Sequence, residues 1–187
     1  MTLAFIAHDP DAIPVHLLAE EDVEPWLAEQ DSTTQAWAKA HAFTGAIGQA
    51  LTFPGDTGIA MALVGYGNAD RRRRARFHLA AGAARLPAGT YALHSTLDIP
   101  DLEVEALGWL LAGYRYERNK AQSTMGAQLR APAGIGTARI EAMAQGEALT
   151  RTLINTPASD MGPPALETAA RTLADQFGAE INVTIGD

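Results

Sequence analysis

The sequence predicts an α/β fold, with a mixed β-sheet flanked by helices in the manner of a macro domain. Short apolar runs alternate with helical runs, and one pair of short runs is joined only by turn-forming residues. Strands joined by a tight turn are antiparallel, whereas strands joined through a helix run parallel, so the sheet is predicted to be mixed. Its core must rest on small and aliphatic side chains, because 47% of the 187 residues are hydrophobic but only 6% are aromatic.

Strands are predicted where short apolar runs are bounded by Gly, Pro, Asn or Asp. In chain order these runs are residues 3–7, 15–18, 50–53, 59–64, 90–95, 128–130 and 181–185. Residues 54–58, Pro-Gly-Asp-Thr-Gly, join the third run to the fourth. Because all of these residue types favour turns, the two strands are predicted to form a hairpin.

Helices are predicted where apolar side chains recur every three or four residues. In chain order they begin at or near Val23, Trp37, Asp70, Asp101, Thr137 and Pro163. Trp37 is expected to open a buried face that ends near Phe43. Asp70 is interpreted as the N-cap of a helix reaching about Arg85, and Asp101 as the start of the next one.

The chain is predicted to change character after the break at residues 132–136, Pro-Ala-Gly-Ile-Gly. Residues 1–136 form the first domain, 137–157 a linker helix, and 158–187 the beginning of a second α/β domain. The last helix is expected to end at Gly178 as its C-terminal cap. Its predicted buried face consists of Leu166, Ala170, Leu173 and Phe177. Because a helix feeding a final strand opens an α/β unit, we interpret the sequence as a truncated piece of a longer protein.

The motifs of common catalytic sites are missing. There is no cysteine, and there is no GxxxxGK[ST] phosphate loop, HExxH metalloprotease helix or GxSxG nucleophile elbow. No two histidines stand at the helical spacing of metal ligands, so each is predicted to be structural or solvent-facing. They are His8, His16, His41, His78 and His94. No catalytic, cofactor-binding or metal-binding residue is predicted in this chain.

The charge balance argues against broad binding to nucleic acid or to a membrane. Fourteen Lys and Arg against 22 Asp and Glu give a net charge of -8. The amino terminus has no basic segment typical of a signal peptide, and the longest apolar runs, 58–67 and 106–114, are too short to cross a bilayer. The sequence therefore predicts a cytoplasmic protein.

Two local features allow a second interpretation. Gly65, Tyr66, Gly67 and Asn68 lie between a strand and a helix, where open α/β sheets bind nucleotide phosphates. Asp70 replaces the third glycine of GxGxxG and would repel a phosphate, so a tight structural turn is favoured. The alternative is a stand-alone macro-like module that binds a nucleotide or ADP-ribose through this turn.

The second feature is a run of four arginines at 71–74, followed by Arg76. Four consecutive residues of a helix point in all directions, so they cannot form one reading face. A solvated or acid-paired helix is favoured over a nucleic-acid site.

The segment from Arg151 onward carries a family resemblance. Arg151, Leu153, Asn155 and Pro157, with Met161 and Pro163 after them, follow the pattern R-x-L-x-N-x-P-x-x-x-M-x-P. This pattern resembles the entry into the catalytic half of the leucyl aminopeptidases, or cytosol aminopeptidases. Upstream, the segments beginning at Pro14, Leu86 and Gly108 resemble the amino-terminal domain of the alphaproteobacterial branch.

The resemblance implies a parent enzyme that removes amino-terminal residues from peptides with two divalent ions, manganese or zinc. The family's ligand motifs lie beyond Asp187, so the chain is expected to be the non-catalytic amino-terminal domain, with no cofactor of its own. Asp160, Asp175 and Asp187 are not assigned as ligands. The parent is expected to be a homohexamer assembled through its catalytic halves, and this chain a monomer or dimer.

Overall fold

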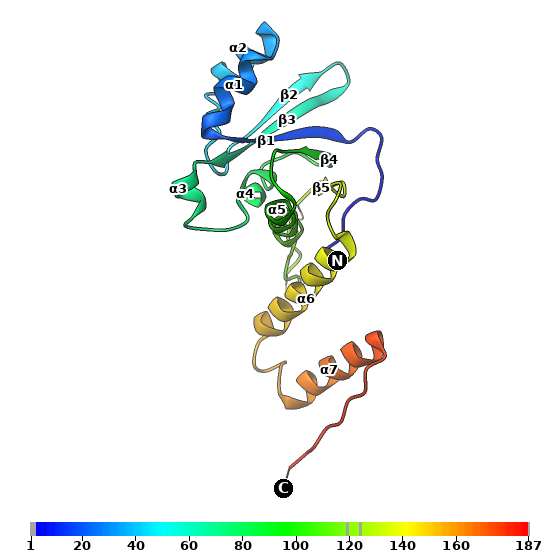
Figure 1. Cartoon of the computed structure of the whole chain (residues 1–187). Helices are drawn as coiled ribbons and strands as arrows, with labels where there is room; N and C mark the ends of the chain where they lie inside the picture. The colour runs from blue at the N-terminus through cyan, green and yellow to red at the C-terminus, as the bar shows by residue number, and fades with distance from the viewer. Residues whose placement is uncertain (1–2, 119, 124, 187) are drawn as a thin grey trace.

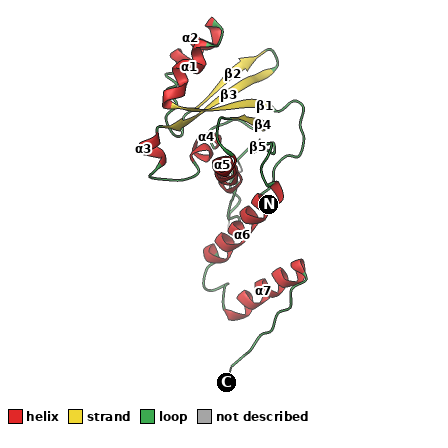
Figure 2. Cartoon of the chain, in the orientation of Figure 1, coloured by secondary structure: helices red, strands yellow, loops and turns green. Residues whose placement is uncertain are grey.

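The computed structural model describes residues 3–118, 120–123 and 125–186, which form helices around one β-sheet (Figures 1 and 2). The strands are β1 (Ile13–Ala19), β2 (Ala50–Gly55), β3 (Gly58–Gly67), β4 (Gly89–His94) and β5 (Ala127–Leu129). The helices are the 3-10 turn η1 (Glu20–Asp22), α1 (Val23–Ala28), α2 (Ser32–Ala40), α3 (Ala69–Arg72), α4 (His78–Ala83), α5 (Ile99–Ala112), α6 (Thr137–Asn155) and α7 (Pro163–Phe177). The predicted α/β class is confirmed.

The sheet is mixed, with the strand order β2-β3-β1-β4-β5. β2 and β3 form the predicted antiparallel hairpin, and every other neighbouring pair is parallel. Figure 1 shows α1 and α2 on one side of the sheet and α4 and α5 on the other. Because side chains alternate along a strand, Val15 of β1 belongs to the core beneath α4 and α5, whereas Leu18 belongs to the core beneath α1 and α2.

The larger core is centred on α5. Trp109 is 1% exposed, and its indole Nε1 donates a hydrogen bond to the carbonyl oxygen of Ala127 at 3.2 Å. Ile140 and Ala144 of α6 belong to the same core, so the first half of α6 is anchored to the domain. Figure 1 shows the second half of α6 leading away from the sheet toward α7.

Local side chains protect the two edge strands of the sheet. On β2, the carbonyl oxygen of Thr52 accepts a hydrogen bond from Trp37 Nε1 at 3.0 Å, and Pro54 has no N–H to offer. On the opposite edge, β5 has only three residues and is followed by a single parallel bridge between Ile6 and Arg130. Trp37, predicted to open a buried face, lies inside α2 and is 37% exposed because it covers this edge.

The predicted strand at residues 3–7 is wrong. Leu3 and Phe5 are buried as expected, but Ile6 alone forms a bridge to the sheet. The reason lies in the N–H of Phe5, which donates to Glu141 Oε1 of α6 at 2.9 Å instead of to a neighbouring strand. A side chain of the linker helix therefore ends the ladder.

The predicted single helix from Asp70 to Arg85 is also wrong, because it is split into α3 and α4. Phe77 sits between the two with φ of 62°, a left-handed conformation that a helix cannot contain. Its ring packs against Gly108 of α5, where a Cβ atom would lie 2.6 Å from Phe77 Cβ. Tertiary packing therefore outweighs the helix-forming sequence.

Two helices begin a few residues earlier in the chain than the sequence predicts. The side chain of Asn68 accepts a hydrogen bond from the N–H of Arg71, and Asp98 does the same for Asp101. These two residues, and not Asp70 and Asp101, are the N-caps.

Helix α7 forms as predicted, but its predicted apolar face is not buried. α7 ends at Gly178, whose φ of 63° is the expected left-handed cap. Its predicted buried face is exposed instead: Leu166 is 53% and Phe177 71% exposed, and Ala170 and Leu173 are exposed as well. Residues 181–185 do not form the predicted strand, since no neighbouring strand within the described residues pairs with them.

Candidate functional site

Residues 65–67, predicted to form a tight turn, belong to the end of β3, and two of their amides are bound within the chain. The N–H of Gly65 donates to the carbonyl oxygen of Gln49 at 2.9 Å, and the N–H of Gly67 donates to that of Gly45 at 2.7 Å. A phosphate would need such N–H groups free, as they are in phosphate-binding turns. The structural interpretation of this segment agrees with this geometry, although β3 continues to Gly67 where a turn was predicted, and the nucleotide or ADP-ribose alternative gains no support from it.

The glycines of this turn are required by close packing. At Gly65 a Cβ atom would lie 2.6 Å from the carbonyl oxygen of Gly45, and it would be closer still to that of Ala46. Gly67 has φ of 69°, and a Cβ there would meet the side chain of Ile47 at 2.5 Å. Their function is therefore to let the 45–47 segment lie against β3.

The arginine run lies beside this turn, and its members have different roles. Arg72 is partly buried: its guanidinium lies 4.7 Å from the ring centre of Tyr66, donates to the Gly67 carbonyl oxygen at 2.6 Å and forms a 3.6 Å ion pair with Glu21. Arg73 pairs with Asp70. The other three arginines, Arg71, Arg74 and Arg76, are exposed. This agrees with the solvated, acid-paired interpretation of the run.

A hollow of about 640 Å³ lies between this run and α5. Arg73 and Arg76 line it together with Asp101 and Glu105, so its wall carries charges of both signs. Glu105 is buried, and its carboxylate accepts a hydrogen bond from the N–H of Leu79 at 2.8 Å. This side chain holds the start of α4 in place.

Burial raises the pKa values of two side chains that line the inner wall of this hollow, Glu105 and Tyr66. It raises the pKa of Glu105, although hydrogen bonds from the backbone of Leu79 and His78 act in the opposite direction. Burial, with the nearby Glu105 carboxylate, also raises the pKa of Tyr66 to about 12. The Tyr66 hydroxyl is therefore protonated at neutral pH and cannot act as a general base.

The structure brings together two histidines that sequence reasoning treated as unrelated. His16 of β1 and His94 of β4 are direct register partners, and their ring centroids lie 5.1 Å apart. Trp26 of α1 lies 5.2 Å from the His16 ring. Both histidines fall in predicted strands, but only the strand register could have revealed the pair. His8 is exposed, and His41 and His78 each contact a backbone carbonyl oxygen.

Acidification is expected to destabilise the fold through this pair. Burial and, to a lesser extent, the charge of His94 lower the pKa of His16 below its ordinary value of 6.5. The unfolded chain then binds a proton more readily than the folded chain does. The contribution of His16 to the free energy of unfolding is therefore fully present above the ordinary pKa of 6.5 and is lost as the pH falls through the folded-state pKa. Between about pH 7 and about pH 5, the free energy of unfolding of His16→Asn should fall less than that of the unchanged chain.

Chemical denaturation at a series of pH values measures this difference. His41→Asn serves as the control, because His41 is the exposed C-cap of α2 and has no contact with the pair, so the variant should leave the slope unchanged. Equal slopes for His16→Asn and the unchanged chain would contradict the expectation.

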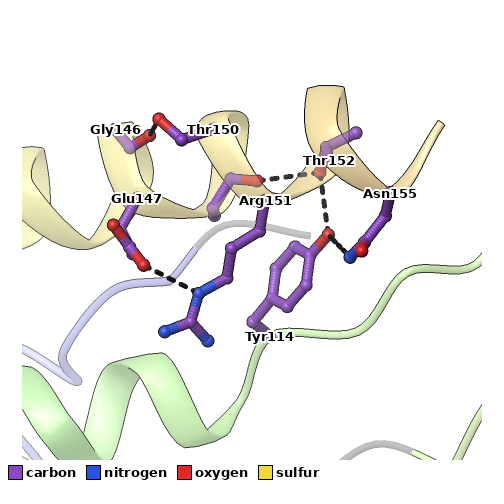
Figure 3. A network of polar contacts seen from close by, with 8 residues as sticks. Tyr114, Gly146, Glu147, Thr150, Arg151, Thr152 and Asn155 are labelled. Atoms are coloured by element: carbon purple, nitrogen blue, oxygen red, sulfur yellow. Dashed lines mark hydrogen bonds and ion pairs between the residues drawn. The ribbon is translucent and has the colours of Figure 1, made fainter.

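The motif that carried the resemblance lies at the junction between the domain and α7 (Figure 3). The hydroxyl of Tyr114, which follows α5, lies 3.2 Å from Thr152 Oγ1 and accepts a hydrogen bond from Asn155 Nδ2 at 3.4 Å. The guanidinium of Arg151 lies 5.8 Å from the Tyr114 ring centre, and its Nε donates to Glu147 at 2.9 Å. Motif residues therefore fasten the end of α6 to the segment after α5.

Two further contacts extend this junction beyond α6. The hydroxyl of Tyr116 donates to Thr156 Oγ1 at 3.4 Å, and Arg118 forms a 3.2 Å ion pair with Asp160. The segment after α5 thus touches the chain on both sides of Pro157. Sequence reasoning placed both tyrosines in the segment from Gly108 that resembles the family, but it did not predict these contacts, because nothing local marks a residue that meets a partner some forty positions away.

The part of the chain that the structure describes contains neither a cluster of three or more metal-ligand side chains nor a membrane-spanning helix. Within it, no group of three or more His, Asp and Glu side chains converges on a point that could hold an ion. None of its helices combines the length and the hydropathy needed to cross a bilayer.

A family model described as "M17 aminopeptidase, N-terminal domain" matches residues 13–132, which is more than half of the chain. The chain belongs to this family. The match begins with β1 and ends just after β5, so it covers the whole sheet. No curated protein sequence matches the chain. The resemblance inferred from the sequence is confirmed.

Solved structures, two of them of aminopeptidases, share this fold. A cytosol aminopeptidase from Coxiella burnetii is 27% identical, with a TM-score of 0.83 over 94% of this chain and 38% of its own. A mutant tomato leucine aminopeptidase is 18% identical, with a TM-score of 0.64 over 94% of this chain and 42% of its own. The bottromycin maturation enzyme BotP is 23% identical, with a TM-score of 0.62 over 89% of this chain and 38% of its own.

The M17 chain thus spans less than half of each of these proteins. The matched share of this chain reaches well past residue 132, so α6 and most of the segment after it also have counterparts in the Coxiella burnetii structure.

Proposed function

We propose that this chain is the non-catalytic amino-terminal part of a leucyl aminopeptidase whose whole protein removes amino-terminal residues from peptides. The observation that carries the proposal is the match of 94% of the chain to a cytosol aminopeptidase with a TM-score of 0.83. The chain corresponds to 38% of that protein, so the remainder is free to hold the reaction centre.

The same proposal divides the chain into three parts. Residues 1–136 are the amino-terminal domain, 137–157 the linker helix and 158–187 the beginning of the catalytic domain. The junction contacts support a mechanical role for the linker, since Tyr114 fixes the end of α6 and Arg118 reaches Asp160 beyond it. The domain would thereby set the direction in which the catalytic part leaves it.

The metal centre is proposed to lie outside this chain. M17 aminopeptidases are metal-dependent, and one BotP structure is described as a complex with Mn. The described residues do not fit a centre of two manganese or zinc ions, because no three carboxylate or imidazole groups converge among them. Residues 1–187 are therefore proposed to contain no catalytic residue, no cofactor-binding residue and no ligand of the catalytic metal ions.

An activity assay tests whether the reaction centre lies outside this chain. The chain alone, supplied with Mn²⁺ and leucine p-nitroanilide, should show no turnover above buffer. A chimera in which this chain replaces the matching amino-terminal part of the Coxiella burnetii enzyme should hydrolyse the same substrate when Mn²⁺ is present. The Coxiella burnetii enzyme without that part is the control and should be inactive.

Two outcomes would overturn the proposal. Chelator-sensitive turnover by the chain alone would show that it contains a reaction centre. A chimera that is folded by circular dichroism but inactive would show that this chain cannot serve as the amino-terminal part of an aminopeptidase.

Assembly and location are proposed on the same basis. The parent is proposed to be a homohexamer, and to be cytoplasmic in line with the cytosol aminopeptidase that the chain resembles. This chain by itself is proposed to be a monomer or dimer that binds no nucleic acid. Sedimentation of the chain at several concentrations measures its oligomeric state, and a hexamer of the chain alone would contradict the proposal.

A further inference from the structure

The histidine pair on the sheet offers two ligands to a common point. His16 and His94 come from neighbouring parallel strands at the same register position, and their rings are inclined by 26°. His94 is exposed and His16 is partly exposed, so an ion can reach both rings from solvent.

The ring nitrogens of this pair are free to bind an ion. Among the described residues, no hydrogen bond joins the ring of His16 or His94 to another group, and no buried polar side-chain atom is left without a partner. The histidines outside the pair differ. His41 Nδ1 lies 2.9 Å from a carbonyl oxygen and His78 Nε2 3.2 Å from another, while His8 contacts no second imidazole.

The spacing of the two rings suits chelation. Two imidazoles that bind one tetrahedral ion at about 2.0–2.1 Å hold their ring centres about 5 Å apart. The observed centroid separation is 5.1 Å, but the two rings are stacked. Because an imidazole nitrogen binds an ion in the plane of its ring, both side chains must rotate to turn one nitrogen of each ring toward the same point.

We propose that His16 and His94 together bind one divalent ion of the zinc, nickel and copper class, with water completing the coordination. Imidazole is a preferred ligand of these ions, whereas magnesium and calcium prefer oxygen. The site is independent of the proposed two-ion centre of the parent. A bound ion would link β1 to β4 and would stabilise the folded chain by mass action.

Calorimetric titration of the tag-free chain with Zn²⁺ tests the site. One ion per chain is expected to bind, and Zn²⁺ should raise the melting temperature. His16→Asn and His94→Asn should each weaken binding at least about tenfold, because even the outer partners of metal ligands contribute about 10–100-fold to affinity. His41→Asn is the matched control and should bind as the unchanged chain does.

Tryptophan fluorescence locates the ion independently. Trp26 lies 5.2 Å from His16, whereas Trp37 lies 4.4 Å from His41. Quenching by Cu²⁺ should therefore disappear in Trp26→Phe and persist in Trp37→Phe. The reverse pattern would place the ion at His41 and overturn the proposal.

The remaining outcomes are equally decisive. Absence of Zn²⁺ binding to the unchanged chain refutes the site, as does undiminished binding to both His16→Asn and His94→Asn. Because His94 is exposed, His94→Asn should retain the fold even if His16→Asn does not, and circular dichroism checks this.

Discussion

Replacing Gly65 with alanine is expected to lower the free energy of unfolding by about 3 kcal/mol. A Cβ at this position would lie 2.6 Å from the carbonyl oxygen of Gly45 and even closer to that of Ala46. Both obstacles are backbone atoms, and the Gly45 carbonyl oxygen also accepts the hydrogen bond from Gly67 at 2.7 Å. The added methyl group therefore cannot be accommodated by rotation of a side chain.

Gly146→Ala is the matched control for this substitution. Gly146 lies inside α6, and a Cβ there would meet no atom within 4 Å. Alanine favours a helix interior by about 0.5–1 kcal/mol relative to glycine, so this variant should be slightly stabilised. Urea denaturation measures both values, and an unchanged midpoint for Gly65→Ala would show that the 45–47 segment can move away from β3.

Trp109→Ala should be at least as damaging, with an expected loss of about 3–5 kcal/mol in the free energy of unfolding. The side chain is 1% exposed and occupies the core in which α4, α5 and α6 meet the sheet. Its removal would leave a cavity and would also leave the Ala127 carbonyl oxygen without the indole N–H that now lies 3.2 Å away. The edge strand β5 should loosen first.

Trp109→Phe separates the two contributions. Phenylalanine fills most of the volume but cannot donate to Ala127, so a loss near about 1 kcal/mol would measure the hydrogen bond. Equal losses for the alanine and phenylalanine variants in urea denaturation would contradict the packing argument. Amide hydrogen exchange of Arg130, whose N–H donates to the Tyr91 carbonyl oxygen of β4 at 2.8 Å, would report the loosening at the end of β5.

Periodicity and turn chemistry were enough to predict most of the elements. The β2–β3 hairpin, the start of α7 and its cap at Gly178 all depend on residues adjacent in the sequence. These features follow from local preferences of Pro, Gly and β-branched residues, which the surrounding fold did not override.

Two of the errors share a physical cause, since each was decided by a residue distant in the sequence. Gly108 receives Phe77 and breaks the helix predicted from Asp70. Glu141 binds the N–H of Phe5 and ends the first predicted strand after one bridge. No local pattern carries such information.

The same limit applied to the candidate sites. His16 and His94 each looked isolated in the sequence, and only the register of β1 against β4 makes them neighbours. Residues 65–68 could be predicted as structural from Asp70 alone, but the hydrogen bonds that occupy the amides of Gly65 and Gly67, to Gln49 and Gly45, could be seen only in the fold.

The protection of the sheet edges has a consequence for the domain in a crowded solution. A strand with unpaired backbone groups is a template onto which a foreign strand can add, and repeated addition leads to fibrils. At one edge of the sheet, the Trp37 indole occupies the Thr52 carbonyl oxygen and Pro54 has no N–H, and both hinder the addition of a strand. At the other edge, the short length of β5 hinders strand addition. Resistance to aggregation is thus built into the ends of the sheet and does not depend on the protein's acidic charge alone.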